Sequence, residues 1–320
     1  MTIEISVVIP TYNRARLLHH TLDALRRQTL AADRFEVVVV DDGGSDDAED
    51  VVRSFADDLD VKYYWQEDAG FRAGKARNIG TAIASGTYVV YVDTGVLLGS
   101  RTLETHLEIH GRATYPTVVV GYVYGFEFDA AALDALAGGL DHQDADATID
   151  LLHERGAFDV REKQYQELGE IIAGWPAPFD IFWTCHASAE REEVLAAGMF
   201  DESFTSWGGE DVDLGVRLFQ RNNLFVMERT ARSFHWPHDK EVEDLRESSA
   251  NAADRIHEKY GLWVTSFYGK DLQDEKYSLN KVIRIFTGNG AQGTKPSTGT
   301  TGTAEATDAA GATRGTPGAR

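Results

Sequence analysis

The segment Ile5-Ser6-Val7-Val8-Ile9-Pro10 begins the pattern that decides the fold. Its apolar run is typical of a buried strand, and Leu18, Leu22 and Leu25 follow it at helical spacing. The same order returns further along the chain, with strands expected at 35–40, 61–65 and 87–92 and a helix expected at 73–84. Such alternation predicts a parallel sheet with helices on both faces.

A further helix is expected between the second and third strands. Val52, Phe55 and Leu59 supply its apolar positions. Asp46 and Glu49 stand three residues apart ahead of them, which is the spacing of a capping box. We therefore expect this pair to cap the start of that helix.

Polar residues follow three of the expected strands, at 10–14, 41–44 and 93–95. Ligands of a parallel sheet gather at the carboxyl ends of its strands, so these segments are expected to share a site. Asp42 can accept hydrogen bonds from a base or a ribose. Asp93 can bind a ribose hydroxyl or a divalent metal, because hard oxygen ligands suit magnesium and manganese. Each carboxylate can equally cap a turn or a helix.

A basic cluster of Arg72, Lys75 and Arg77 precedes the fourth expected strand. In an acidic protein such a cluster can face a diphosphate. The solvated face of a helix explains Arg72 and Lys75 equally well, so both interpretations stay open.

The composition argues against several classes of partner. The 320 residues are 42% hydrophobic and carry a formal net charge of -21, which disfavours nucleic acid and anionic membrane surfaces. Cys185 is the single cysteine, so an intramolecular disulfide is excluded. With neither a signal-peptide pattern nor an apolar run long enough to span a bilayer, we expect a cytoplasmic protein without an integral membrane segment.

Two phosphate-binding motifs are excluded by their spacing. The first strand is not followed by Gly-x-Gly-x-x-Gly, and the segment Gly70 to Lys75 lacks both the spacing and the hydroxyl residue of a P-loop. Dinucleotide oxidoreductases and P-loop enzymes are therefore disfavoured.

The segment 205–214, Thr-Ser-Trp-Gly-Gly-Glu-Asp-Val-Asp-Leu, indicates a second part of the site. Gly208 and Gly209 allow a sharp turn and a close approach to a ligand. Glu210 and Asp211 then fall in the first turn of a helix, whose dipole is expected to keep both carboxylates ionised, as suits a general base. An acidic helix start without a catalytic role is the alternative.

These motifs, in this order, resemble the family 2 glycosyltransferases. The segments 6–14, 40–45, 74–78 and 86–93 resemble the nucleotide-binding half of that family, and Trp207 to Asp211 resembles the acceptor-side motif of its chondroitin-polymerase-like and galactosyltransferase-like members. The resemblance implies the GT-A fold, a Rossmann-like wound mixed sheet with a fused C-terminal acceptor-binding part. Residues 1–100 would be the nucleotide-sugar-binding half, 101–286 the acceptor-binding and catalytic half of the same domain, and 287–320 a disordered tail.

The resemblance assigns roles residue by residue. On the donor side it implies that Pro10, Tyr12 and Arg14 line the nucleotide pocket, that Asp42 contacts uracil or ribose, that Arg77 lies near the base or diphosphate, and that Asp93 opens the Asp-x-Asp motif. On the acceptor side it implies that Trp207 forms a sugar-binding wall with Gly208 and Gly209, that Glu210 binds a hydroxyl, and that Asp211 is the base. His186 stands where relatives commonly have an asparagine and is assigned to the acceptor site.

The metal site departs from the family pattern at one position. Gly95 stands where the second aspartate of the motif is usual. The resemblance then implies that Asp93 and a histidine hold the metal, and His235 is preferred over His238. Manganese is expected to serve better than magnesium, because manganese accepts imidazole readily.

The expected function is inverting transfer of a sugar from a nucleotide sugar, with UDP as the expected nucleotide, to an acceptor hydroxyl. The acceptor can be a glycan, a lipid-linked sugar or a small molecule such as an aminocyclitol. A nucleotidyltransferase and an inactive nucleotide-sugar-binding protein are the alternatives. The donor sugar and the oligomeric state stay open.

Deleting the residues after Gly290 should leave the melting temperature and the transfer activity nearly unchanged. This segment is poor in large apolar residues and can bury little surface. Thermal denaturation and an activity assay of the shortened chain check this expectation. A substantial loss of either would show that the segment docks on the domain.

Overall fold

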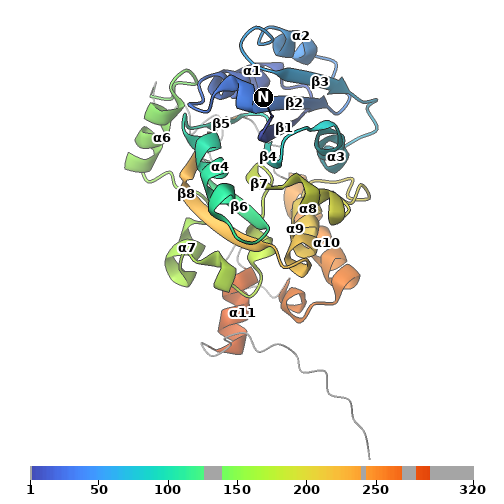
Figure 1. The fold of residues 1–320 in the computed structure, drawn as a ribbon. Helices are drawn as coiled ribbons and strands as arrows, with labels where there is room; N and C mark the ends of the chain where they lie inside the picture. The colour runs from blue at the N-terminus through green and yellow to red at the C-terminus, as the bar shows by residue number, and fades with distance from the viewer. Residues whose placement is uncertain (1, 126–138, 239–242, 269–278, 289–320) are drawn as a thin grey trace, which may run out of the picture.

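The computed structural model describes residues 2–125, 139–238, 243–268 and 279–288, whose strands form one sheet of eight (Figure 1). The order across the sheet is β3-β2-β1-β4-β7-β6-β8-β5. The strands are β1 (Ile5–Thr11), β2 (Phe35–Asp41), β3 (Val61–Trp65), β4 (Tyr88–Val92), β5 (Val96–Leu98), β6 (Thr117–Tyr124), β7 (His186–Glu190) and β8 (Leu224–His235). The expected division at residue 100 falls between β5 and the next helix, within one continuous sheet.

The four strands predicted from the alternating pattern are parallel. β1 pairs with β2 and β4, and β2 pairs with β3, all in parallel register. The remainder of the sheet is mixed, because β7 runs antiparallel to β4 and β6, and β5 runs antiparallel to β8. The sheet is therefore mixed as the GT-A resemblance implies, and the parallel prediction holds for its first four strands.

Helices cover both faces of the sheet (Figure 1). Alternate residues of β2 show this, since Val37 and Val39 share a core with α1 and α2 whereas Val38 and Val40 face α3. The helices are α1 (Ala15–Arg26), α2 (Ala48–Arg53), α3 (Ala73–Ile83), α4 (Thr102–Arg112), α6 (Ala145–Glu154), α7 (Glu162–Leu168), α8 (Arg191–Ala196), α9 (Glu210–Gln220), α10 (Glu243–Tyr260) and α11 (Leu279–Thr287). Short 3-10 helices span Ala32–Arg34, Ile172–Gly174, Pro178–Ile181 and Trp263–Phe267. The end of the expected tail, 289–320, lies outside the described residues.

The predicted capping box of α2 is wrong. The residue at the N-terminal cap of α2 is Asp47, and its side chain makes no capping hydrogen bond. The carboxylate of Asp46 instead accepts a hydrogen bond from the backbone N–H of Ala15, the first residue of α1, at 2.7 Å. Asp46 is therefore committed to another helix start that sequence spacing does not reveal.

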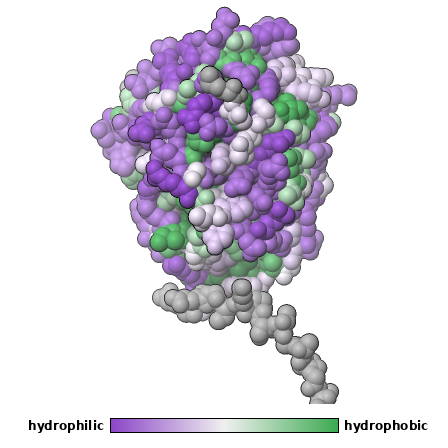
Figure 2. All heavy atoms as spheres, in the orientation of Figure 1, coloured by the Kyte–Doolittle hydropathy of each residue, from purple (hydrophilic) through white to green (hydrophobic). Residues whose placement is uncertain are grey.

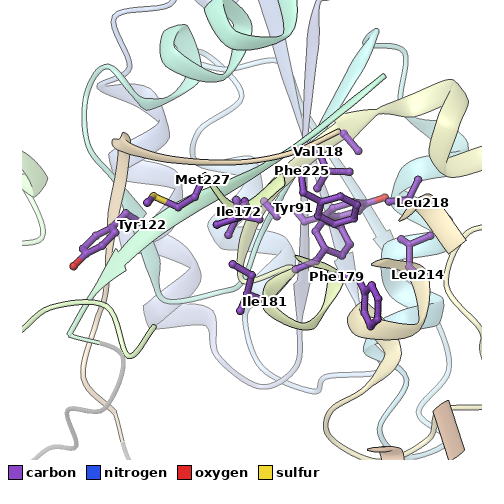
Figure 3. Packing of buried hydrophobic residues seen from close by; sticks show 14 of the residues in the cluster. Tyr91, Val118, Tyr122, Ile172, Phe179, Ile181, Leu214, Leu218, Phe225 and Met227 are labelled. Carbon is purple, nitrogen blue, oxygen red and sulfur yellow. The ribbon is translucent and has the colours of Figure 1, made fainter. Parts of the chain in front are cut away.

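The apolar side of α9 is buried in the larger core of the domain. Leu214 and Leu218 of α9 share this core with Phe179 of the Pro178–Ile181 helix and Phe225 of β8 (Figure 3). Burying one leucine side chain is worth about 1.5 to 3 kcal/mol. This packing fixes the start of α9 near the sheet, where the carboxylates of the 205–214 segment lie.

The surface in the orientation of Figure 1 is largely hydrophilic, with apolar side chains scattered over it (Figure 2). Across the described ranges, every helix is too short or too polar to cross a membrane.

A polar layer lies buried between α4 and β7. His106 and His110 of α4 bond to Ser188 of β7, and His106 also bonds to His186, with all four side chains at most 5% exposed. Burial lowers the pKa of His110 to about 4 and that of His186 to about 3, and it holds the pKa of His106 well below its usual value. The three imidazoles are therefore neutral at pH 7.

The buried imidazoles predict that stability falls on acidification. Between about pH 6.5 and pH 4 the unfolded chain binds protons on histidines that the folded chain keeps neutral, so the free energy of unfolding decreases as the pH falls. One such histidine contributes about 1 kcal/mol per pH unit in this window. When the free energy of unfolding is measured with urea at several pH values, that of His110→Gln should change less steeply with pH than that of the wild type, by about 1 kcal/mol per pH unit.

His19→Gln is the matched control, because His19 is exposed. It shows how much the substitution of an exposed histidine by glutamine changes the measurement. Equal slopes for the two variants and the wild type would contradict a neutral, buried His110.

Candidate active site

Two glycines set the start of α9. Gly208 and Gly209 have φ angles of 90° and 95°, in the left-handed region that favours glycine. A Cβ at Gly209 would also lie 2.5 Å from the Cβ of Ala252 in α10. The two glycines therefore let the chain turn into α9, and Gly209 also lets α10 pack against it. Their approach to a ligand stays a prediction.

Glu210 and Asp211 occupy the first turn of α9, as predicted. The Asp211 carboxylate accepts hydrogen bonds from the backbone N–H of Val212 at 2.8 Å and of Thr184 at 3.4 Å. Burial raises the pKa of Asp211 and the Glu210 carboxylate raises it further, whereas Arg77 lowers it. The expectation that the helix start keeps Asp211 fully ionised is therefore wrong, because lost hydration outweighs the helix N–H groups. A pKa closer to neutrality suits a general base.

Arg77 of α3 joins two carboxylates from distant parts of the chain. One of its terminal nitrogens donates to Asp93 at 2.8 Å and the other donates to Glu210 at 3.0 Å. The guanidinium lies 5.6 Å from the ring centre of Phe200 and is 4% exposed. The structure therefore brings the strand-end aspartate and the acidic start of α9 into one charge cluster, whereas the roles that the resemblance implies for them stay predictions.

Three buried polar atoms of this cluster have no hydrogen-bond partner within the residues that the structure describes. They are Oε2 of Glu210, Oγ1 of Thr184 and Nε of Arg77. Buried polar groups in proteins are normally paired, so a ligand or an ordered water molecule is expected to supply the partners of these atoms. Sequence reasoning missed Thr184, because a threonine in this position carries no signal until the packing is known.

The carboxyl end of β2 carries Asp42, which is 6% exposed. Its carboxylate accepts hydrogen bonds from the backbone N–H of Arg72 at 2.7 Å and from the side-chain amide of Gln66. Gln66 was not singled out from the sequence, and its Oε1 atom is buried without a partner among the described residues. Of the predicted basic cluster, Arg72 precedes α3 and Lys75 is half-buried in its first turn.

The other predicted nucleotide residues lie around the end of β1. Tyr12 is 47% exposed and its hydroxyl donates to Asp68 at 3.2 Å. The carbonyl of Pro10 accepts a hydrogen bond from the Thr94 hydroxyl at 2.9 Å, and Arg14 is the cap residue of α1. The ends of β1, β2 and β4 thus meet as the sequence predicted, whereas contact with a nucleotide stays a prediction.

Trp207 and His186, which were both assigned to the acceptor site, differ in their surroundings. Trp207 is 39% exposed, which leaves part of its surface available as a sugar-binding wall. His186 is 0% exposed, and its ring bonds to Ser233 at 2.8 Å and to His106 at 3.0 Å. The assignment of His186 to acceptor contact is therefore wrong, because the ring lies inside the domain.

The residues expected to hold a metal flank one turn. His235 ends β8 and pairs with Val96 of β5, three residues beyond Asp93. His235 is 7% exposed and its ring stacks on that of His238 with 4.8 Å between centres. Within the described part of the chain, no three histidine, cysteine or acidic side chains are grouped closely enough to hold a metal on their own.

Gly95 lies in that turn, and an aspartate at this position would not simply restore the metal ligand that the family usually has there. Its φ angle is 97°, where a side chain is strained, and a Cβ there would face Leu17 of α1 at 3.5 Å. The assignment of Asp93 and His235 as metal ligands stays a prediction.

Residues 6–133 match the family model described as Glycosyl transferase family 2. Over 259 residues the chain is 37% identical to the validoxylamine A glucosyltransferase of Streptomyces hygroscopicus subsp. jinggangensis, a match that covers 80% of this chain and 61% of that protein. The chain therefore spans less than two thirds of this curated relative.

Solved structures show the same fold at low sequence identity. TarS 1-349 of S. aureus in complex with UDP-GlcNAc has a TM-score of 0.57 and 17% identity, covering 89% of this chain and 72% of that one. The mannosyltransferase PcManGT of Pyrobaculum calidifontis, in complex with GDP-Man and Mn2+, has a TM-score of 0.57 and 20% identity, covering 81% and 64%. Residues 6–133 thus carry a glycosyl transferase family 2 domain, and the chain has the GT-A fold of these glycosyltransferase structures.

Proposed function

We propose that this chain transfers a sugar from a UDP sugar to an acceptor hydroxyl with inversion at the anomeric carbon. The observation that carries the proposal is the buried Glu210, which neighbours Asp211 in the chain and is joined through Arg77 to Asp93 at the end of β4. A single arginine thus links the neighbour of the candidate base to a candidate donor ligand. A direct displacement needs these two functions close together.

In the proposed reaction Asp211 removes the proton from the acceptor hydroxyl as the acceptor oxygen attacks the anomeric carbon of the donor sugar. The attack comes from the side opposite the diphosphate, so the configuration inverts. The unpartnered Oε2 atom of Glu210 accepts a hydrogen bond from a sugar hydroxyl and orients that sugar. Bound at Asp93 and His235, a manganese or magnesium ion would supply positive charge for the departing diphosphate.

The comparisons guide the choice of substrates. The relative at 37% identity is named for glucosyl transfer to validoxylamine A, which favours a glucose donor and an aminocyclitol acceptor over a glycan or a lipid-linked sugar. The complexes of TarS with UDP and with UDP-GlcNAc support a UDP-linked donor.

The test is incubation of the full chain with UDP-glucose, manganese and validoxylamine A, followed by chromatography of nucleotides and products. Transfer releases UDP with one equivalent of glycosylated acceptor. Release of glucose 1-phosphate, with UMP transferred to the acceptor, would indicate a nucleotidyltransferase instead. Binding of the donor without product, across a panel of UDP sugars and acceptors, would indicate a binding protein.

Asp211→Asn should abolish transfer and leave UDP affinity nearly unchanged. The amide keeps the shape of the side chain but cannot take the proton, and loss of a general base typically costs about a hundred- to ten-thousand-fold in turnover. Turnover and a UDP titration measure the two quantities separately.

Asp213→Asn is the matched control, because Asp213 lies in the same turn of α9 but bonds to Arg217, Lys259 and Tyr260. It should lower the melting temperature while the folded protein keeps turnover within a few-fold of the wild type. Transfer by Asp211→Asn at a rate close to the wild type would remove Asp211 from the mechanism.

Removal of metal by excess chelator should stop transfer, and manganese should restore it better than magnesium. His235→Ala should raise the manganese concentration needed for half-maximal activity far more than His238→Ala does. Full activity in excess chelator would instead indicate that basic side chains, and no metal ion, stabilise the leaving diphosphate. If His238→Ala alone changed the manganese response, His238 would replace His235 as the ligand.

A further inference from the structure

We propose that His186 is a positioning residue, which holds the segment 184–186 so that Asp93 and Asp211 keep a fixed separation. The proposal rests on the proposed function, because it gives His186 a role in the geometry of that reaction. It replaces the acceptor contact that the sequence assigned to this histidine.

The segment 184–186 contacts both carboxylate residues through its backbone. The N–H of Thr184 donates to the Asp211 carboxylate at 3.4 Å. The carbonyl of Cys185, one residue later, accepts a hydrogen bond from the N–H of Asp93 at 3.1 Å. His186 then forms the last pair of the β4–β7 ladder, opposite Val92. A shift of this segment therefore moves the proposed base relative to the proposed donor ligand.

The side chain of His186 holds the segment 184–186 in place through hydrogen bonds to two other elements. Its Nδ1 atom lies 2.8 Å from Oγ of Ser233 in β8, and its Nε2 atom lies 3.0 Å from Nε2 of His106 in α4. Gly121 of β6 makes room for the ring, since a Cβ at that position would overlap the imidazole. The ring is thus fixed by two elements other than its own strand.

The hydrogen bonds of the ring have one consistent direction. In the arrangement that pairs every donor, the Ser233 hydroxyl donates to the carbonyl of Tyr122 at 3.4 Å and its oxygen accepts from Nδ1–H of His186. A neutral imidazole carries one N–H, so Nε2 of His186 must accept, and the donor is Nε2–H of His106.

The same direction continues into α4. Nδ1 of His106 accepts from the Ser188 hydroxyl at 2.8 Å, and the Ser188 oxygen accepts from Nε2–H of His110 at 2.8 Å. Every hydroxyl and every ring in the series donates one proton, so the chain of hydrogen bonds is complete from His110 to the carbonyl of Tyr122. An apolar side chain at position 186 would leave partners unpaired on both sides of the break.

The experiment compares His186→Leu with His110→Leu in the full chain. Both residues are buried in the same series of hydrogen bonds, but His110 contacts β7 at Ser188 and stacks on Tyr88, away from the segment 184–186. Both variants should have lower melting temperatures. Only His186→Leu should lose turnover, by about a hundred-fold, as expected when reacting groups are displaced by about 1 Å. UDP affinity should be unchanged in both.

Ser233→Ala provides a smaller change in case His186→Leu does not fold. It removes the acceptor of the His186 proton and should lower kcat without changing the donor KM. If the leucine variant folds, the double variant should be no slower than His186→Leu, because both changes break one link. Losses that multiply in the double variant, or an unchanged kcat in Ser233→Ala, would overturn the proposal.

Nitrogen-15 NMR of the imidazoles gives a readout that does not depend on activity. The proton should lie on Nδ1 of His186 and on Nε2 of His106 and of His110, and the reverse tautomers would overturn the proposed direction. Wild-type protein without sugar transfer would remove the proposed function and the positioning role together. Transfer by the wild type, with equal turnover in the two leucine variants, would remove the positioning role alone.

Discussion

The ion pairs of Arg77 with Asp93 and Glu210 hold together the proposed active site. Asp93 ends a strand of the parallel half, whereas Glu210 begins a helix that packs on the other half. Asp211 lies beside Glu210, and carboxylates that gather in this way repel one another unless a cation lies among them. The buried guanidinium is that cation, so the two halves of the domain meet around its charge.

Local patterns explain why the first half of the fold could be predicted. β1, β2 and β4 are largely apolar runs, and helices with apolar residues at helical spacing follow β1 and β2, so neighbouring residues carry the information. β7 has the sequence His-Ala-Ser-Ala-Glu, which is short and partly polar. It is buried because His106 and His110 of α4 supply its hydrogen bonds, and such pairing across the chain leaves no periodic signal.

The candidate site divides in the same way. Glu210 and Asp211 could be placed at a helix start, because the glycines and the apolar residues of α9 are adjacent in sequence. The partner of Glu210 could not be identified, since 133 positions separate it from Arg77. His186 was assigned wrongly because a resemblance transfers a position but not its surroundings, and the space that Gly121 leaves for the ring becomes visible only in three dimensions.

The contact between Gly209 and Ala252 shows that sensitivity to mutation and a role in catalysis are two different properties of a residue. A survey of substitutions across the 205–214 segment would mark Gly209 as intolerant of change. That intolerance would come from the crossing of α10 over the start of α9 and from the left-handed backbone, with no substrate involved. Residue 252, in a helix remote from the motif in sequence, would be sensitive to enlargement for the same steric reason. The positions of this domain that are sensitive to mutation therefore include residues at helix crossings as well as residues that take part in the chemistry.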